Sequence, residues 1–179
     1  MNEPHPEVVR DAQSGDLESF AELVRAYQAD VWRLARHLLR DPTAADDVTQ
    51  DTFVRAYRFL RRYRGDSKFS TWLFSIARNC ALDEIRRSGR NQRVAGRVRA
   101  EPHEPDPPPV KRLEIREALQ ELSVELREPV VLIDMLGASY KEASETLATP
   151  VGTVKSRVHR AREQLAHLLL AEEEGAGEL

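Results

Sequence analysis

The chain has 179 residues, of which 41% are hydrophobic and 32% are charged, with a formal net charge of −3 at pH 7. This composition is typical of a folded, water-soluble protein, and no apolar run approaches the roughly 20 residues that span a bilayer. The N-terminal sequence lacks the basic-then-apolar pattern of a secretory signal, so we expect a cytoplasmic protein. Cys80 is the only cysteine, which excludes an intramolecular disulfide, and the five histidines have no metal-ligand spacing. We therefore expect no metal and no cofactor.

The first half of the chain is predicted to be helical. Apolar residues recur at three- and four-residue steps over residues 17–38, which places one apolar stripe on a helix. Asp41 and Pro42 then provide an N-cap followed by proline at the first position of a second helix. Residues 64–67 (RGDS) predict a loop, and Ser70 is predicted to cap a third helix.

Residues 89–110 are predicted to form a flexible linker. They contain many prolines and charges and few apolar side chains, so they cannot bury enough surface to offset the entropy lost on ordering. The linker separates two small domains, residues 10–88 and residues 111–170.

The second domain is also predicted to be helical. We expect Pro129 to open a helix that Gly137 ends, and Ser139 and Glu142 to form a capping box at the start of the next. A last long helix then carries an apolar stripe over residues 151–168. No segment shows the alternation of a strand, so the predicted fold class is all-α.

Positive charge is segregated into two blocks. Residues 55–99 contain 13 Arg or Lys and only three Asp or Glu, and residues 153–162 contain four basic residues and no acid. Two basic blocks in an acidic protein suggest two separate contacts with a polyanion. A solvated, Arg-rich helix face would explain the charge equally well.

The last two helices, joined by a turn of three to four residues, have the layout of a helix-turn-helix. In this motif the second helix enters the major groove of DNA. Val151, Val154 and Val158 are expected to be buried, which leaves a polar outer face to meet bases and phosphates. Its residues are Thr153, Lys155, Ser156, Arg157, His159 and Arg160.

The first domain interleaves aromatic residues with Arg and Lys between residues 55 and 74. Rings can stack on unpaired bases while cations follow the backbone, as single-stranded nucleic acid requires. Phe53 and Trp72 are expected to lie in the core. Tyr63 and Phe69 flank the polar loop and are expected to be exposed.

Two long segments of the chain resemble bacterial sigma factors. The runs DPTAADDVTQDTFVRAY and RYRGDSKFSTWLFSIARN are similar to region 2 of these proteins, and GASYKEASETLATPVGTVKSRVHRAREQL is similar to region 4. The resemblance covers residues 10–170. The short length, with only a linker between the regions, points to the extracytoplasmic-function (ECF) group.

The resemblance implies a non-enzymatic factor that binds core RNA polymerase and directs promoter-specific initiation. It implies docking on the clamp helices of the largest polymerase subunit through Asp46, Asp47, Gln50, Asp51 and Phe53. It implies melting and capture of the −10 element through Tyr63, Arg64, Ser67, Lys68, Phe69 and Asn79. In such factors a flipped base enters a pocket to which Tyr63 and Asn79 correspond.

The outer face of the last helix would then read the −35 duplex. The implied partners are promoter DNA, the clamp helices and flap of core polymerase, and a cognate anti-sigma factor, which is often membrane-anchored in this group. No small-molecule substrate is expected.

The second domain departs from the family pattern at two positions. The family usually has a larger aliphatic residue where Ala143 stands and a glycine where Ala148 stands. Neither position lies on the DNA face, so we expect an effect on stability more than on function.

Two other functions compete with this one. A helix-turn-helix regulator that binds duplex DNA alone would need neither the acidic helix nor the aromatic loop. An enzyme acting on nucleic acid would need clustered carboxylates, metal ligands or a nucleophile with its base, and the sequence shows none of these patterns.

Overall fold

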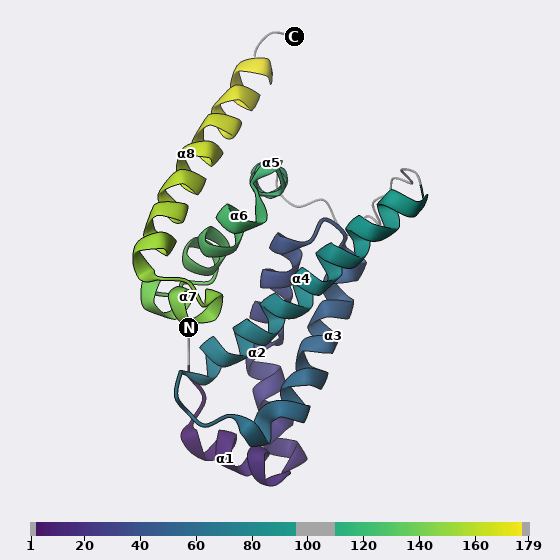
Figure 1. The fold of residues 1–179 in the computed structure, drawn as a ribbon, viewed down its shortest axis with the longest axis vertical. Coiled ribbons are helices and arrows are strands. Elements are labelled where there is room, and N and C mark those ends of the chain that lie inside the picture. Colours follow the sequence, from purple (N-terminus) through teal and green to yellow (C-terminus); the bar gives the residue numbers. More distant parts are fainter. Residues whose placement is uncertain (1–2, 96–109, 177–179) are drawn as a thin grey trace. The chain divides into compact units, whose positions relative to one another are not determined.

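The computed structural model describes residues 3–95 and 110–176. The chain divides into two compact units, Met1–Glu101 and Pro102–Leu179. Every regular element in the described ranges is helical (Figure 1), which confirms the all-α fold class.

The first unit contains four α-helices and one short 3-10 helix. They are α1 (Pro6–Ser14), α2 (Leu17–Leu38), α3 (Pro42–Phe59), η1 (Leu60–Arg62) and α4 (Phe69–Ala95). Helix α2 packs against α1, α3 and α4, and α3 also packs along α4 (Figure 1). The apolar stripe of α2 is thereby covered on several sides and forms the core of the unit.

Helix α1 was not anticipated from the sequence, because it is short and precedes the long apolar stripe. Gly15 ends it in the left-handed conformation at φ 103°, and Asp16 then caps α2 by accepting from the Ser19 amide at 2.8 Å. Asp41 caps α3 as predicted, accepting from the Thr43 amide at 3.0 Å.

Helix α4 differs from the prediction at both ends. It begins at Phe69, so Ser70 lies inside the helix and is not its N-cap. It continues to Ala95, into the segment 89–110 that was expected to be linker. Residues 96–109 of that segment lie outside the described residues.

The second unit is built around its last helix. Its elements are α5 (Val110–Glu121), α6 (Val124–Val130), the π-helical turn η2 (Val131–Met135), α7 (Tyr140–Leu147) and α8 (Val151–Ala176). Helices α5, α6 and α7 all pack against α8. Among the residues of α8 whose side chains the structure describes, Val154, Val158 and Ala161 are fully buried.

Local signals locate most helix ends in this unit. Ser139 and Glu142 form the predicted capping box. Gly137 follows the turn η2 and adopts the left-handed conformation at φ 69°. Pro129 does not open a helix, however, because α6 already begins at Val124 and the proline lies within it. Ala148 ends α7 in the left-handed conformation at φ 48°, a conformation that favours glycine.

Candidate nucleic-acid interface

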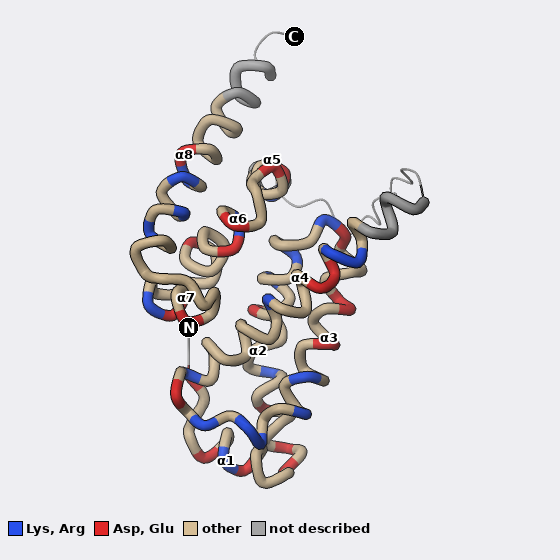
Figure 2. The backbone as a smooth tube through the Cα atoms, viewed as in Figure 1, with Lys and Arg blue, Asp and Glu red and all other residues tan. Residues whose placement is uncertain are grey.

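Acidic residues recur along α3 (Figure 2), and they form an acidic face of this helix. The helical period brings the four predicted polar residues to this side, and all four are exposed: Asp46, Asp47, Gln50 and Asp51. Phe53, expected in the core, is half-buried at its edge. Val54 lies among the acids with 49% of its surface exposed, which gives the face an apolar centre. Acidic side chains around an apolar centre suit a protein partner.

A tryptophan from α2 extends this face. The indole Nε1 of Trp32 donates a hydrogen bond to Asp46 Oδ1 at 2.7 Å, and the ring is partly exposed. Sequence analysis did not single out Trp32, although it falls off the apolar stripe between Val31 and Leu34. Its position outside that stripe was the available signal.

The predicted loop and its flanking aromatic residues form one cluster. Tyr63 and Phe69 have ring centroids 5.9 Å apart, and each lies within 5.6 Å of the Trp72 ring. Tyr27 of α2 covers the other side of Phe69 at 5.6 Å. Phe69 is therefore 4% exposed, and the expectation that it would be exposed was wrong because three rings enclose it.

Tyr63 is half-buried and held at both its side chain and its backbone. Its hydroxyl donates to the Ser67 carbonyl at 2.6 Å, which closes the loop. Gln13 of α1 donates from Nε2 to the Leu60 carbonyl at 3.1 Å and to the Tyr63 carbonyl at 2.8 Å. Burial raises the pKa of the Tyr63 phenol, so the ring stays neutral.

The N-terminus of α4 is capped from a distance by Glu3. Its carboxylate accepts from the Phe69 amide at 3.0 Å, from the Ser70 amide at 3.3 Å and from the Ser70 hydroxyl. Ser70 is thus a donor to the true cap. No sequence pattern pointed to Glu3, because it lies 66 residues before its partner.

A pocket of about 440 Å³ opens between this N-terminal arm, α1 and the loop. Its walls contain three cations, one acid and two aromatic rings, together with smaller residues: Glu3, Pro4, Pro6, Val9, Arg10, Gln13, Tyr63, Arg64, Gly65, Lys68 and Phe69. Tyr63, Arg64, Lys68 and Phe69 among the predicted −10 residues therefore share one cavity, with Ser67 in the same loop.

Asn79 lies apart from this pocket. It is exposed on α4, seven residues beyond Trp72, which corresponds to about 10 Å along the helix axis. The structure therefore does not bring Asn79 and Tyr63 into one cavity. Asn79 lies on nearly the same face of α4 as Trp72, whose ring contacts Tyr63, because a seven-residue step returns to nearly the same helix face.

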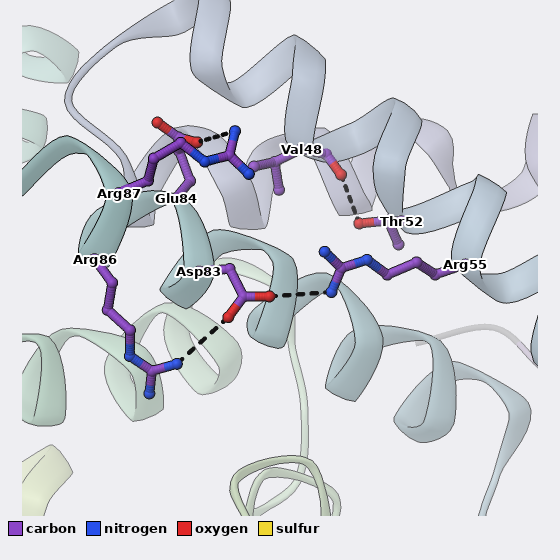
Figure 3. Close-up of polar contacts among 7 residues, drawn as sticks. All are labelled: Val48, Thr52, Arg55, Asp83, Glu84, Arg86 and Arg87. Carbon is purple, nitrogen blue, oxygen red and sulfur yellow. Dashed lines mark hydrogen bonds and ion pairs between the residues drawn. The ribbon is translucent and has the colours of Figure 1, made fainter. Parts of the chain in front are cut away.

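An ionic network ties α3 to α4 (Figure 3). Asp83 Oδ2 accepts from Arg55 Nη1 at 3.1 Å, and its Oδ1 lies 3.4 Å from Arg86 Nη1. Beside it, the buried Thr52 hydroxyl donates to the Val48 carbonyl at 2.7 Å. Asp83 therefore offsets part of the positive charge of this block at Arg55 and Arg86, although the side chain of Arg86 is 68% exposed.

The predicted buried thiol lies against the same helix pair. Cys80 on α4 is buried, and burial raises the pKa of its thiol. A buried, protonated thiol is a packing group, as expected.

Helices α7 and α8 form the helix-turn-helix, and basic residues follow the first turns of α8 (Figure 2). The predicted outer positions are exposed at Lys155, Ser156, His159 and Arg160, and half-buried at Thr153 and Arg157. Val151, expected to be buried, is 38% exposed because it occupies the first turn of the helix.

Arg157 is turned toward α6. Its Nη2 lies 3.4 Å from Glu125 Oε2, and only 23% of its side chain is exposed. Arg160 projects from the next turn with its side chain exposed. The two arginines that the sequence places on one face therefore have different surroundings.

Further contacts fix the start and middle of α8. The Lys155 ammonium lies 5.8 Å from the centre of the Tyr140 ring, a cation–π contact with α7. Arg162 makes two hydrogen bonds to Asp134 in η2, at 2.6 and 3.0 Å, and this pairing raises the pKa of Arg162. These contacts orient the helix that carries the candidate base-reading residues.

Within residues 3–95 and 110–176, no helix is long and apolar enough to span a bilayer. No three His, Cys, Asp or Glu side chains within the same residues gather closely enough to hold a metal ion.

Family comparisons match both units. The family model of Sigma-70 region 2 matches residues 23–91, and that of Sigma-70, region 4 matches residues 112–165. The ECF RNA polymerase sigma factor SigE of Mycolicibacterium smegmatis is 40% identical over 181 residues, covering 94% of this chain and 69% of the relative. The ECF RNA polymerase sigma factor SigW of Bacillus subtilis is 32% identical over 173 residues, covering 88% and 92%.

Solved structures give the same match. CnrH in complex with the cytosolic domain of CnrY has a TM-score of 0.73 at 31% identity and covers 92% of this chain and 96% of its own. The sigma factor RpoE of Bartonella quintana, in complex with the anti-sigma factor NepR, has a TM-score of 0.75 at 29% identity and covers 86% and 98%.

Proposed function

The chain belongs to the ECF group of RNA polymerase sigma factors and directs promoter-specific transcription initiation, and we propose how its two units divide that work. The first unit binds the polymerase and captures the opened −10 element. The second unit reads the −35 duplex. The observation that carries this division is that one chain joins an aromatic and cationic pocket to a helix-turn-helix with a basic face.

Polymerase docking is assigned to the acidic face of α3. Asp46, Asp47, Gln50 and Asp51 supply the charge, with Phe53 at its edge. Val54 and Trp32 add apolar contact area that the charged residues alone would lack. Apolar contact at the centre of an interface contributes most of the affinity, and the surrounding charges steer the approach of the partner.

Capture of the −10 element is assigned to the loop and the face of α4. Tyr63, Arg64, Ser67 and Lys68 would contact an unpaired base and its backbone, with Asn79 meeting the strand about two turns further along. Phe69 is enclosed by rings, so its role in this assignment is to support Tyr63.

Recognition of the −35 element is assigned to α8. Lys155, Ser156, His159 and Arg160 are exposed and able to reach the major groove, with Thr153 beside the helix start. Arg157 acts through its pairing with Glu125, which orients α8 against α6.

The factor has no catalytic activity of its own in this proposal, and it acts in the cytoplasm. Opening of the promoter is driven by binding energy, since unpaired bases are trapped as they appear. We further propose control by a cognate anti-sigma factor. Support comes from two solved relatives: RpoE of Bartonella quintana is in complex with the anti-sigma factor NepR, and CnrH is in complex with the cytosolic domain of CnrY.

In vitro run-off transcription tests the function. Core polymerase of the same bacterium is combined with this protein and a genomic promoter library, and the transcripts are sequenced. We expect a discrete promoter set that shares two elements. Silence, together with binding to duplex DNA in the absence of polymerase, would instead identify a stand-alone regulator.

A further inference from the structure

The most unusual contact in the first unit is the one between Glu3 and the start of α4. A carboxylate accepts from the first two amides of a 27-residue helix and from the hydroxyl of Ser70. Exposed amides at a helix N-terminus, with the partial positive charge of the helix dipole, form a site for an anionic oxygen group. In this protein the site already contains an anion, and the anion comes from the chain itself.

The surroundings of Glu3 suit a larger polyanion. The pocket wall contains Arg10, Arg64 and Lys68, and Glu3 is the one acid among the lining residues. Tyr63 stands in the same wall, where a ring could cover an unpaired base. A phosphate beside a stacked base therefore fits the group of side chains better than a lone carboxylate does.

Glu3 is also in a position to leave. It precedes α1, whose first backbone hydrogen bonds begin at the His5 carbonyl, so no helical bond holds residue 3. A phosphate oxygen can accept from the same Phe69 and Ser70 amides. The exchange would leave no buried donor without a partner, which keeps its cost small.

We propose that the Glu3 carboxylate occupies the place of a DNA phosphate in the free protein and that a phosphate of the unwound −10 strand displaces it. This inference rests on the −10 assignment of the loop proposed above. The contact acts as an intramolecular competitor. It weakens binding of unpaired nucleic acid to the pocket until a promoter strand supplies both a base and a phosphate.

The test compares two neutralising substitutions. Glu3→Gln removes the competing charge, and Asp11→Asn removes one charge from an exposed position of α1, outside the pocket lining. Each full-length variant is assembled with core polymerase. Its affinity is then measured on a fluorescent promoter fragment with a pre-opened −10 segment, taken from the run-off screen. One unit charge about 5 Å from a phosphate in a watery site corresponds to roughly fourfold in affinity, so Glu3→Gln should bind at least about threefold more tightly than Asp11→Asn.

A second measurement follows the amides themselves. Hydrogen exchange at Phe69 and Ser70 should be faster in free Glu3→Gln than in the unsubstituted protein, because glutamine has one acceptor oxygen where the carboxylate has two, and it should slow again when the opened promoter binds. Weaker DNA binding by Glu3→Gln, or binding equal to that of Asp11→Asn, would overturn the proposal and leave Glu3 as a permanent cap.

Failure of the −10 assignment would look different. In that case Tyr63→Ala would also leave binding of the opened fragment unchanged. If the run-off screen yielded no promoter at all, the proposed function itself would fall, whatever Glu3 does.

Discussion

In the first unit, Tyr63 is held by Gln13, 50 residues earlier in the chain, and the helix that follows it is capped by Glu3, 66 residues from Phe69. In the second unit, all the candidate reading residues lie on one helix, α8. Ser156 donates to the Thr153 carbonyl and His159 lies 3.2 Å from Glu163 within that helix, while Arg157 and Lys155 contact Glu125 and Tyr140 of neighbouring helices. One face is assembled from distant segments, and the other is carried by a single helix that its neighbours orient.

This difference matches two kinds of recognition. A pocket for an unpaired base needs walls from several elements, fixed before the base arrives, so that ordering them costs nothing at the moment of binding. A duplex reader needs a helix of the right face and direction, because the major groove supplies the complementary shape. We therefore expect distant substitutions to affect −10 capture more than −35 reading.

The largest effect is expected from Tyr63→Ala. Base–aromatic stacking contributes about 1–3 kcal/mol, so promoter opening should fall by roughly 5- to 150-fold. Tyr63→Phe keeps the ring and loses only the hydrogen bond to Ser67, and its defect should be smaller. Opening is measured by permanganate reactivity of the −10 segment. Affinity for core polymerase should be unchanged, and an equal loss of both would contradict the pocket assignment.

The two arginines of α8 give the next comparison. Arg160→Ala should reduce discrimination between correct and altered −35 sequences by about 1–3 kcal/mol, the value of a bidentate contact with guanine. Arg157→Ala should weaken promoter binding with less change in base preference, because its guanidinium pairs with Glu125. Affinities on a panel of −35 variants measure both.

A double-mutant cycle with Glu125→Ala separates the two roles. Arg157 should be coupled to Glu125 and Arg160 should not. If Arg157→Ala changes base preference as strongly as Arg160→Ala, Arg157 contacts bases directly.

A distant substitution tests the tertiary origin of the pocket. Gln13→Ala removes the two hydrogen bonds to the Leu60 and Tyr63 carbonyls, each contributing about 0.5–1.5 kcal/mol, so promoter opening should fall several-fold. Ser14→Ala is the matched control, since the Ser14 hydroxyl donates only to the Arg10 carbonyl within α1. Equal effects of the two would show that α1 contributes stability alone.

The same contrast explains how far sequence analysis reached. The capping box at Ser139, the N-cap at Asp41 and the exposure of four of the six outer positions of α8 were predicted, because each depends on residues within a few positions. The burial of Phe69 and the cap from Glu3 were missed. Helical periodicity gives the direction of a side chain, but it does not indicate which distant element will cover it.

The smallest effect concerns the turn of the helix-turn-helix. Ala148 has φ 48° and ψ 44°, a left-handed conformation in which a Cβ is disfavoured by about 1–2 kcal/mol. Ala148→Gly relieves that strain, but glycine also increases the conformational entropy of the unfolded chain, which offsets part of the stabilisation. The free energy of unfolding of the second unit should therefore rise by about 0.5–1 kcal/mol. Amide exchange of the buried residues of α7 and α8 measures this change in the free energy of unfolding.

Ala166→Gly, the same change at an exposed position inside α8, should lower stability by about 1 kcal/mol. Opposite signs for one substitution would show that backbone conformation decides the outcome, and a destabilised Ala148→Gly would mean that the Cβ of Ala148 packs favourably enough to outweigh the strain.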